Sequence, residues 1–484
     1  MPTNRLQLKR ITPKLEKLEE RTTPAVIQYT GSLLSVTMNK SNTLTVTESI
    51  TTSGTYTVTE GSTTVGTFIT SGITIIGTNS SDIITVSLRD NNTGGMSGIL
   101  TIRSGNGNDT VSIVGGSTNT PVIRGGINAD LGYGDDILSI GDASRLTVRG
   151  TTVTNGNLGS DTLNIGTSAS AITGTTLTSL SSTDFNIVTI GPTATGTAAI
   201  SQTATITPGT GSMGLIFTLN AAGTINKGVI TGTSLADTIT LNGVVSGNLS
   251  SGGDALTVTT GLGNDSLSVG TVGSNTYNTG LTFNAGDGTD TFTTTSGSVI
   301  GGDLTLNMVS TVNDAGNTFN FATGTQVYGN LTISEITSAN YGNVGPANQS
   351  ITFNGQVNGD VNLRLGDSDH TISFTLAAIG GGDYSGYLSV SNYTNNTALT
   401  SGAGTGTGDN TVTFDVGSAS VTYIYTILLG SGDDVFTFTT TAGTLTLTGR
   451  ATPPSSTLNG GGGTNTLTSG ATLAYSNLTK VNFT

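Results

Sequence analysis

The sequence predicts an all-β protein built as a parallel β-helix, in which the chain winds into stacked coils of about 26 residues. Three observations predict this fold: a turn motif with two glycines and an aspartate that recurs along the chain, the regular spacing of that aspartate, and alternating side-chain character after it. The composition agrees, since 71 of 484 residues are Gly, none is Cys or Trp, and 34% are hydrophobic. Such a chain favours many short strands joined by tight turns, and it has no disulfide or thiol chemistry.

The turn motif reads G-x-G-x-D-x-φ-x-φ, where φ is an apolar residue. Glycine in a sharp corner allows a positive backbone φ angle, so a structural role is expected for both glycines. The strict copies are Gly105-Gly107-Asp109, Gly132-Gly134-Asp136, Gly261-Gly263-Asp265, Gly286-Gly288-Asp290 and Gly430-Gly432-Asp434. Degenerate copies keep the aspartate at Asp82, at Asp161 after Gly159, and at Asp237; others place Asn317, His370, Asn410 or Asn465 in its position.

The aspartate position recurs at nearly constant intervals. The steps are 27, 27 and 25 residues along Asp82, Asp109, Asp136 and Asp161, and 28, 25 and 27 residues along Asp237, Asp265, Asp290 and Asn317. A unit of this length is too small to bury its own apolar face and must stack on its neighbours. In the interval between the two runs, Asp184 and Met213 fall near the expected places. We therefore expect one continuous rod over residues 25–484.

Each aspartate is followed by a short strand with a fixed facing. After Asp109, for example, Val111 and Ile113 are apolar, while Thr110 and Ser112 carry hydroxyls. Alternation with a period of two, repeated in every coil, indicates a parallel sheet with an apolar inner face and a Ser/Thr outer face.

The aspartates themselves point to a metal. Six of the 30 acidic residues are Glu, which leaves 24 Asp. Stacked carboxylates about 4.8 Å apart repel one another, and together with corner carbonyl oxygens they suit a hard cation such as Ca²⁺. The alternative is a purely structural Asx turn. The predicted Ca²⁺ ligands are Asp82, Gly105, Gly107, Asp109, Gly132, Gly134, Asp136, Gly159, Asp161, Asp237, Gly261, Gly263, Asp265, Gly286, Gly288 and Asp290.

The motif resembles the Ca²⁺-binding nonapeptide G-G-x-G-x-D-x-φ-x of hemolysin-type (RTX) repeat proteins, and GTSLADTI at Gly232–Ile239 looks like the opening phrase of such repeats. The resemblance implies Ca²⁺ binding at the corners and an extracellular or cell-surface location. The chain departs from that family because its motif occurs once per coil instead of every nine residues. Only one edge of the solenoid is therefore expected to carry metal.

Residues 1–24 form a separate, basic segment. Leu8, Ile11, Leu15 and Leu18 fall on one face of a possible short amphipathic helix. The stretch KLEKLEERTTPAV (Lys14–Val26) resembles the L-E-x-R-x-x-P-A segment near the start of exported and surface proteins of planctomycete bacteria, which implies a sorting role. A helix that caps the first coil is the alternative. No apolar stretch is long enough to span a bilayer, and none has signal-peptide character.

The predicted function is structural or adhesive: a secreted or cell-surface rod that contacts surface or matrix components, polysaccharide or other copies of itself. A net charge of −14 disfavours nucleic acid as a partner. No enzyme is expected, because the single histidine, His370, occupies an aspartate position of the repeat. One alternative is a Ca²⁺-dependent polysaccharide lyase that uses the arginines Arg103, Arg124, Arg145 and Arg149; another is an ice-binding protein that uses the outward Thr rows.

Overall fold

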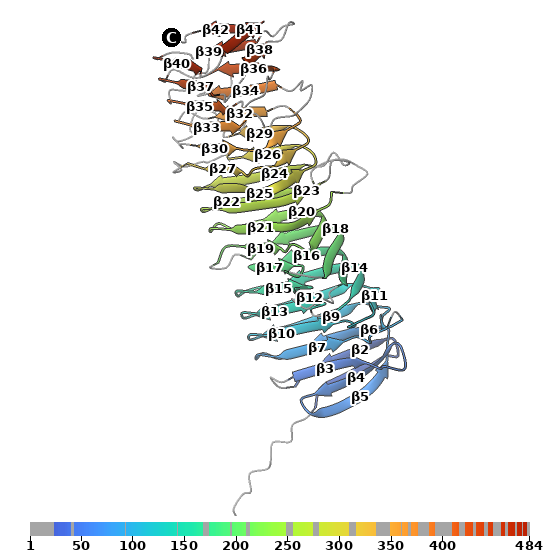
Figure 1. The fold of residues 1–484 in the computed structure, drawn as a ribbon. Helices are drawn as coiled ribbons and strands as arrows, with labels where there is room; N and C mark the ends of the chain where they lie inside the picture. The colour runs from blue at the N-terminus through green and yellow to red at the C-terminus, as the bar shows by residue number, and fades with distance from the viewer. Residues whose placement is uncertain are drawn as a thin grey trace, which may run out of the picture.

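The structure is a β-solenoid whose parallel strands stack coil on coil into one column (Figure 1), as the sequence predicts. None of the described residues forms a helix that is long and apolar enough to cross a membrane. The N-terminal segment 1–24, with its predicted amphipathic helix, lies outside the described residues except for Pro24. This computed structural model describes residues 24–39, 43–91, 93–142, 144–167, 174–193, 196–209, 213–247, 255–273, 280–308, 316–334, 349–359, 361–365, 369–375, 387–392, 409–415, 422–428, 432–439, 444–448, 456–459, 463–469, 472–476 and 478–481.

The strands that follow the aspartate position form the first face of the solenoid. Each pairs in parallel with its equivalent one coil away, so residues of equal rank in the repeat stand side by side. These strands are β3 (Thr43–Glu48), β7 (Ile83–Ser87), β10 (Thr110–Val114), β13 (Ile137–Ile140), β15 (Thr162–Ile165), β17 (Ile187–Ile190), β19 (Ile216–Leu219), β21 (Thr238–Val245), β23 (Ser266–Val272), β25 (Thr291–Ile300), β27 (Thr318–Phe321), β30 (Ser350–Phe353), β33 (Thr371–Thr375), β35 (Thr411–Asp415), β37 (Val435–Thr439) and β40 (Thr466–Ser469).

The strands that lead into the glycine turn form the second face. They are β2 (Leu33–Thr37), β6 (Gly72–Ile76), β9 (Leu100–Asn106), β12 (Ile127–Tyr133), β14 (Thr147–Asn155), β16 (Gly174–Thr183), β18 (Thr197–Thr207), β20 (Gly223–Thr231), β22 (Leu256–Leu262), β24 (Leu281–Asp287), β26 (Leu304–Asn307), β29 (Leu331–Ser334), β32 (Val361–Leu365), β34 (Tyr387–Asn392), β36 (Thr422–Leu428), β39 (Ser456–Asn459) and β42 (Leu478–Val481). The turn motif therefore joins the second face to the first.

A third, shorter face closes each coil between the first face and the second. It contains β8 (Gly95–Met96), β11 (Val122–Ile123), β28 (Gln326–Val327), β31 (Gln356–Val357), β38 (Thr444–Thr448) and β41 (Thr472–Ser476). In other coils a long strand bends across two faces, as β14 does where its register shifts between Val148 and Thr151.

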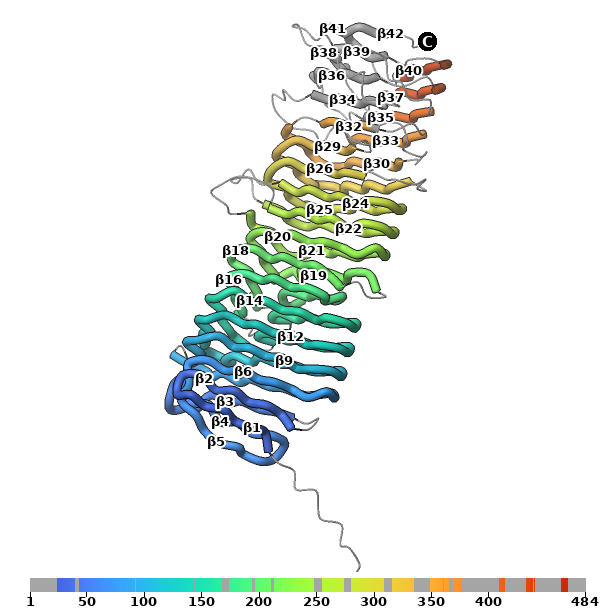
Figure 2. Tube along the Cα trace, turned by 180° about the vertical axis from the view of Figure 1, so that it is seen from behind, coloured from blue at the N-terminus to red at the C-terminus, as the bar shows by residue number. Residues whose placement is uncertain are grey.

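The N-terminal end of the solenoid contains antiparallel strands, which the repeat in the sequence does not predict. β1 (Val26–Tyr29) pairs with β2, and β4 (Thr55–Glu60) pairs with both β3 and β5 (Thr63–Ile69), all antiparallel. Figure 2 shows these strands at the end of the stack. Tyr56 and Val58 of β4 are fully buried, so the hairpin extends the apolar core beyond the first coil.

The core is a continuous column of apolar side chains enclosed by the three faces. The alternation predicted after each aspartate is confirmed, since Val111 is fully buried and Ile113 is 1% exposed, while the hydroxylated residues between them lie on the outer surface. Farther along, phenylalanine rings stack inside the solenoid, with centroids 6.3, 5.3, 4.6 and 5.7 Å apart along Phe283, Phe292, Phe321, Phe353 and Phe374. The glycine turns and their aspartates therefore lie along one edge of a rigidly packed rod.

Candidate cation site at the stacked corners

The predicted aspartates stand directly above one another and are connected by hydrogen bonds. The backbone N–H of Asp82 donates to Oδ1 of Asp109 at 2.8 Å, Asp109 donates in the same way to Asp136 at 2.7 Å, and Asp136 to Asp161 at 2.8 Å. All four side chains are at most 1% exposed. The carboxylates of Asp109, Asp136 and Asp161 thus bind the backbone of the adjacent coil, and we call this column of side chains the inner ladder.

The inner ladder continues through the second run of aspartates and beyond it. The N–H of Asp237 donates to Asp265 at 2.7 Å, Asp265 to Asp290 at 2.9 Å, and Asp290 to Oδ1 of Asn317 at 2.6 Å. Amide and imidazole groups then take the place of carboxylates: the described bonds run from Asn317 to Gln349, from Gln349 to Nδ1 of His370, from Asn410 to Asp434 and from Asp434 to Asn465. The predicted placement of Asn317, His370, Asn410 and Asn465 in this position is confirmed by register.

Three residues of the inner ladder are not the ones that the spacing in the sequence predicts. In the interval between the two aspartate runs, strand register places Asn186 and Leu215 beside Asp161 and Asp237, so the assignment of Asp184 and Met213 is displaced by two residues. Between Asn317 and His370, Gln349 supplies a further member. The apolar pair after Gln349, Ile351 and Phe353, is the sequence signal that would have found it.

Two kinds of corner hold the aspartates. We call Asp82 and Asp237 threonine corners, because Thr78 and Thr233 stand four residues earlier, and we call those with Gly two residues earlier glycine corners. In the threonine corners both carboxylate oxygens are used: Oδ2 accepts the N–H of Thr78 at 2.6 Å or of Thr233 at 2.8 Å. In five glycine corners, those of Asp109, Asp136, Asp161, Asp265 and Asp434, Oδ2 is buried without a hydrogen-bond partner.

The missing partner changes the protonation of these carboxyl groups. Burial raises the pKa of Asp136 to about 7 and that of the others to about 6, as found for Asp109, Asp161, Asp265 and Asp434. Hydrogen bonds from neighbouring backbone act in the opposite direction, and nearby carboxylates add to the rise at Asp136. Near neutral pH, burial therefore opposes ionisation of the glycine-corner carboxyl groups, which is the condition that a bound cation relieves.

The glycines are required by backbone geometry, as the motif predicts. Gly132 and Gly134 have φ angles of +93° and +140°, and a Cβ on either would meet a carbonyl oxygen of the coil before it, that of Gly105 or Gly107. The other predicted glycines also have positive φ: Gly105 (+112°), Gly107 (+110°), Gly159 (+156°), Gly261 (+131°), Gly263 (+112°), Gly286 (+90°) and Gly288 (+139°). Non-glycine residues with positive φ occupy equivalent places at Asn157 and Asp184. The corners therefore bring carbonyl oxygens of one coil close to the next.

A second, outer ladder lies beside the inner one and was not predicted. It uses the residue immediately before each inner-ladder residue and runs in the opposite direction, because the N–H of the later coil donates to the side chain of the earlier one. Asn108 N–H donates to Ser81 at 3.0 Å, Asp135 to Asn108 at 3.1 Å and Ser160 to Asp135 at 2.9 Å. The same pattern connects Asp369, Asp409, Asp433 and Thr464. The corners are thus fixed by side-chain bonds in both directions.

The glycine corners fit a hard cation by the chemistry of their donors. Those of Asp109, Asp136, Asp161, Asp265 and Asp434 offer a buried carboxylate oxygen with no protein donor, close to stacked backbone, and oxygen is the ligand that Ca²⁺ prefers. Among the described residues no three His, Cys, Asp or Glu side chains gather as a ligand cluster. A cation here would consequently need main-chain carbonyl oxygens in addition to aspartate.

The comparisons with known proteins add no relative. No family model matches this chain, and neither the curated proteins nor the solved structures contain a match.

Proposed function

We propose that this chain is a secreted or cell-surface rod with a structural or adhesive role, and that Ca²⁺ bound at its glycine corners stiffens it. The observation that carries the proposal is the buried, unpartnered Oδ2 of Asp109, Asp136, Asp161, Asp265 and Asp434. The inner ladder needs only one oxygen per side chain, and Asn317 supplies it without charge. A carboxylate in the same position brings a buried negative charge that the ladder itself does not use, and this excess charge favours a cation ligand.

Several residues would hold the cation. The carboxylates of Asp109, Asp136, Asp161, Asp265 and Asp434 would each provide the unpartnered oxygen, with carbonyl oxygens from the corner glycines. Asp290, which stands next to Asp265 in the ladder, is a further predicted ligand. Bound Ca²⁺ would neutralise the stacked charges and connect adjacent coils. The same argument does not extend to Asp82 and Asp237, because their second oxygen already accepts a backbone N–H.

The proposal is tested by a Ca²⁺ titration of the full chain followed by circular dichroism and thermal unfolding. Ions that bind only the folded corners raise the unfolding temperature by mass action, and an excess of about 100-fold over the dissociation constant adds about 2.7 kcal/mol per site. Mg²⁺ at equal concentration is the control, because it requires a tighter octahedral site. If chelation with EGTA leaves the melting curve unmoved, the corners are structural turns without metal.

The position of the metal is tested by two matched substitutions. If each site needs aspartate in two successive glycine corners, the pairs Asp109/Asp136, Asp136/Asp161 and Asp265/Asp290 give about three Ca²⁺ in isothermal titration calorimetry. Asp136→Ala then removes about two of them, and Asp434→Ala removes none, because Asn410 and Asn465 flank it. If one unpartnered oxygen is sufficient, both substitutions remove about one ion. Equal losses therefore exclude the paired-corner hypothesis but keep the metal.

The surface location has its own test. The chain is expressed with and without residues 1–24, and cell fractions are compared for the rod. Retention of the truncated rod inside the cell would support the sorting role implied by KLEKLEERTTPAV. Equal export of both forms would contradict that role.

A further inference from the structure

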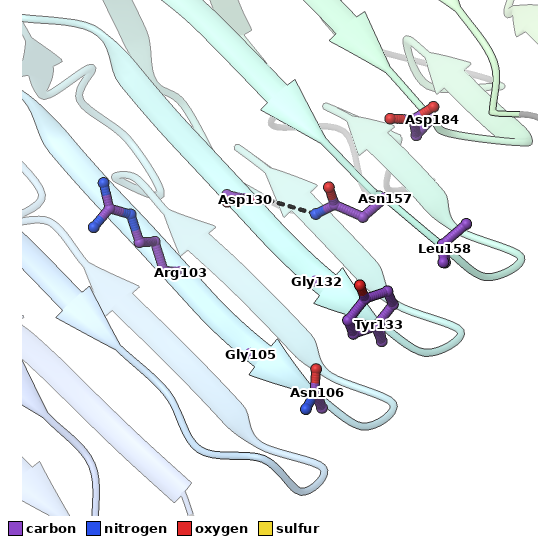
Figure 3. A pocket seen from close by; sticks show the side chains of 9 residues that line it. All are labelled: Arg103, Gly105, Asn106, Asp130, Gly132, Tyr133, Asn157, Leu158 and Asp184. Carbon is purple, nitrogen blue, oxygen red and sulfur yellow. Dashed lines mark hydrogen bonds between the residues drawn. The ribbon is translucent and has the colours of Figure 1, made fainter.

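A hollow on the second face of the solenoid lies just before the glycine turns (Figure 3). It has a volume of about 450 Å³ and crosses the ends of β9, β12, β14 and β16. The inner ladder uses none of its side chains. The lining residues are Arg103, Gly105, Asn106, Asp130, Gly132, Tyr133, Asn157, Leu158 and Asp184.

Near the turns, the hollow is lined by two exposed side chains, Tyr133 and Leu158, which we call the apolar step. Tyr133 is 57% exposed and Leu158 is 58% exposed, and the two residues are bridged in parallel on adjacent coils. Asn106 occupies the same place on the coil before Tyr133. An aromatic ring held on a rigid corner offers a flat face at low entropic cost, because the backbone beneath it is already fixed.

The rest of the hollow is polar, and much of it is unused by the protein. Arg103 and Asp130 are register partners on β9 and β12, and Asp130 accepts a hydrogen bond from Asn157 at 2.5 Å. Within the described part of the chain, the Arg103 guanidinium, the Tyr133 hydroxyl and the Asp184 carboxylate make no hydrogen bond or ion pair. Figure 3 shows Arg103 to one side of Tyr133 and Leu158 and Asp184 to the other side.

Two non-glycine residues that line the hollow, Asn157 and Asp184, have positive φ angles. Asp184 has φ +62°, a left-handed conformation that glycine adopts at most corners of the solenoid, and asparagine would tolerate this conformation equally well. Strain retained at a non-glycine residue is a reason to look for a functional side chain. In this hollow it adds a second carboxylate beside the apolar step.

We propose that this hollow binds a neutral carbohydrate chain. A sugar ring has an apolar C–H face, which fits the ring of Tyr133, and a rim of adjacent hydroxyls, which fit the carboxylate of Asp130, the amide of Asn157 and the guanidinium of Arg103. One arginine and two aspartates give the hollow an excess of negative charge, which disfavours uronic acid polymers. A peptide strand finds no open edge here, because β9, β12 and β14 pair on both sides. The inference rests on the proposed surface role for its biological meaning but does not depend on Ca²⁺.

The four arginines noted in the sequence do not support cleavage of such a chain. Only Arg103 lines the hollow; Arg124 and Arg149 follow β11 and the start of β14 on the third face. The hollow is therefore assigned to binding.

The test is affinity electrophoresis of the full chain in gels that contain dextran, mixed-linkage β-glucan or galactomannan, with polygalacturonate as the anionic polymer. We expect retardation by at least one neutral polymer and none by polygalacturonate. Tyr133→Ala should raise the dissociation constant about tenfold, which corresponds to about 1.4 kcal/mol. Leu262→Ala is the matched control, because Leu262 occupies the same exposed turn position in another coil. Failure of every neutral polymer, preference for polygalacturonate, or equal loss in both variants would overturn the proposal.

The two proposals fail separately. Binding is measured with Ca²⁺ and with EGTA, and the melting temperature of each sample is recorded. Carbohydrate binding without a Ca²⁺-dependent melting temperature would refute the metal site alone, and a Ca²⁺-dependent melting temperature without retardation would refute the carbohydrate site alone.

Discussion

Asp237 and Asp265 occupy neighbouring corners of the same ladder and use their carboxylates differently. Asp237 accepts the N–H of Leu215 at Oδ1 and the N–H of Thr233 at Oδ2, at 2.6 and 2.8 Å. Asp265 accepts the N–H of Asp237 at Oδ1, but its Oδ2 is buried without a partner. Gly261 stands where the previous coil has Thr233 and takes a φ of +131°. The two corners thus differ in whether the second carboxylate oxygen accepts a backbone N–H of its own coil.

The difference shows that the ladder and the metal site are separable. The ladder hydrogen bond is made by Asp, Asn and Gln alike, so it accounts for an acceptor in this position but not for a charge. Within the described inner ladder, the glycine corners of Asp109, Asp136, Asp161, Asp265 and Asp434 combine a charge with an unused oxygen. Substitutions that act on one corner type and spare the other can therefore distinguish structural from cation-binding roles.

The largest loss of stability is expected from adding a side chain to a glycine of a glycine corner. Gly263 has φ +112°, and a Cβ there would approach the backbone of Leu235 and Ala236 at 2.6 and 2.7 Å. Gly263→Ala should lower the free energy of unfolding by about 3 kcal/mol or more, because left-handed strain and backbone overlap add. Urea unfolding measures the loss.

Gly297→Ala is the control for that substitution. Gly297 also has a positive φ, +76°, but nothing lies within 4 Å of the added Cβ, so only the conformational penalty of about 1 kcal/mol is expected. Equal losses in both variants would contradict the close stacking of the corners.

A pH series without metal should have the next largest effect. The raised pKa values, about 6 for Asp265 and about 7 for Asp136, mean that the folded state holds more protons than the unfolded state between about pH 4 and pH 7. The free energy of unfolding therefore falls as pH rises through this window. The stabilisation that these carboxyl groups contribute is fully present below about pH 4. We expect the melting temperature in EGTA to fall on the order of 5 °C from about pH 5 to pH 7.5.

Two controls separate the buried carboxyl groups from general surface repulsion. High salt screens exposed charges but leaves buried ones largely unscreened, so the fall should persist in high salt. Ca²⁺ should restore the melting temperature near pH 7.5 and change it little near pH 5. A melting temperature that rises with pH in EGTA would show that the glycine-corner carboxylates are stabilised by protein contacts alone.

The fold was predictable because it depends on local, repeated features. Glycines of positive φ and alternation after the aspartate both follow from the sequence, and the structure confirms them at Gly132 and in β10. The N-terminal hairpin of β4 and β5 was not predictable, because it ends the repeat instead of following it. Leu215 was not predicted because it offers no side-chain acceptor and is placed by strand register alone. Gln349 was not predicted because it follows Asn317 by 32 residues instead of about 26.

The carboxylate environment was predictable only in part. Spacing correctly placed Asp109 beside Asp136, and repulsion between stacked carboxylates was the expected problem. The sequence does not reveal that Oδ1 accepts a backbone N–H, because this depends on how far neighbouring corners are offset along the chain direction. The hollow at Tyr133 was likewise invisible, since its residues come from separate coils and share no motif.

The smallest effect, and the most discriminating, is expected from replacing the two aspartates by asparagine. Asp237→Asn can keep the bond from Leu215, but its NH₂ group then faces the N–H of Thr233, so the variant loses a buried hydrogen bond and about 1–2 kcal/mol of unfolding free energy. Asp265→Asn keeps the bond from Asp237 and removes only a charge that burial disfavours, so its stability in EGTA near pH 7.5 should be unchanged or higher. Urea unfolding with and without Ca²⁺ compares the pair: Ca²⁺ should still stabilise the Asp237 variant fully and the Asp265 variant less. If Asp265→Asn proves the more destabilising change in EGTA, its carboxylate has a structural partner, and the separation between threonine and glycine corners is wrong.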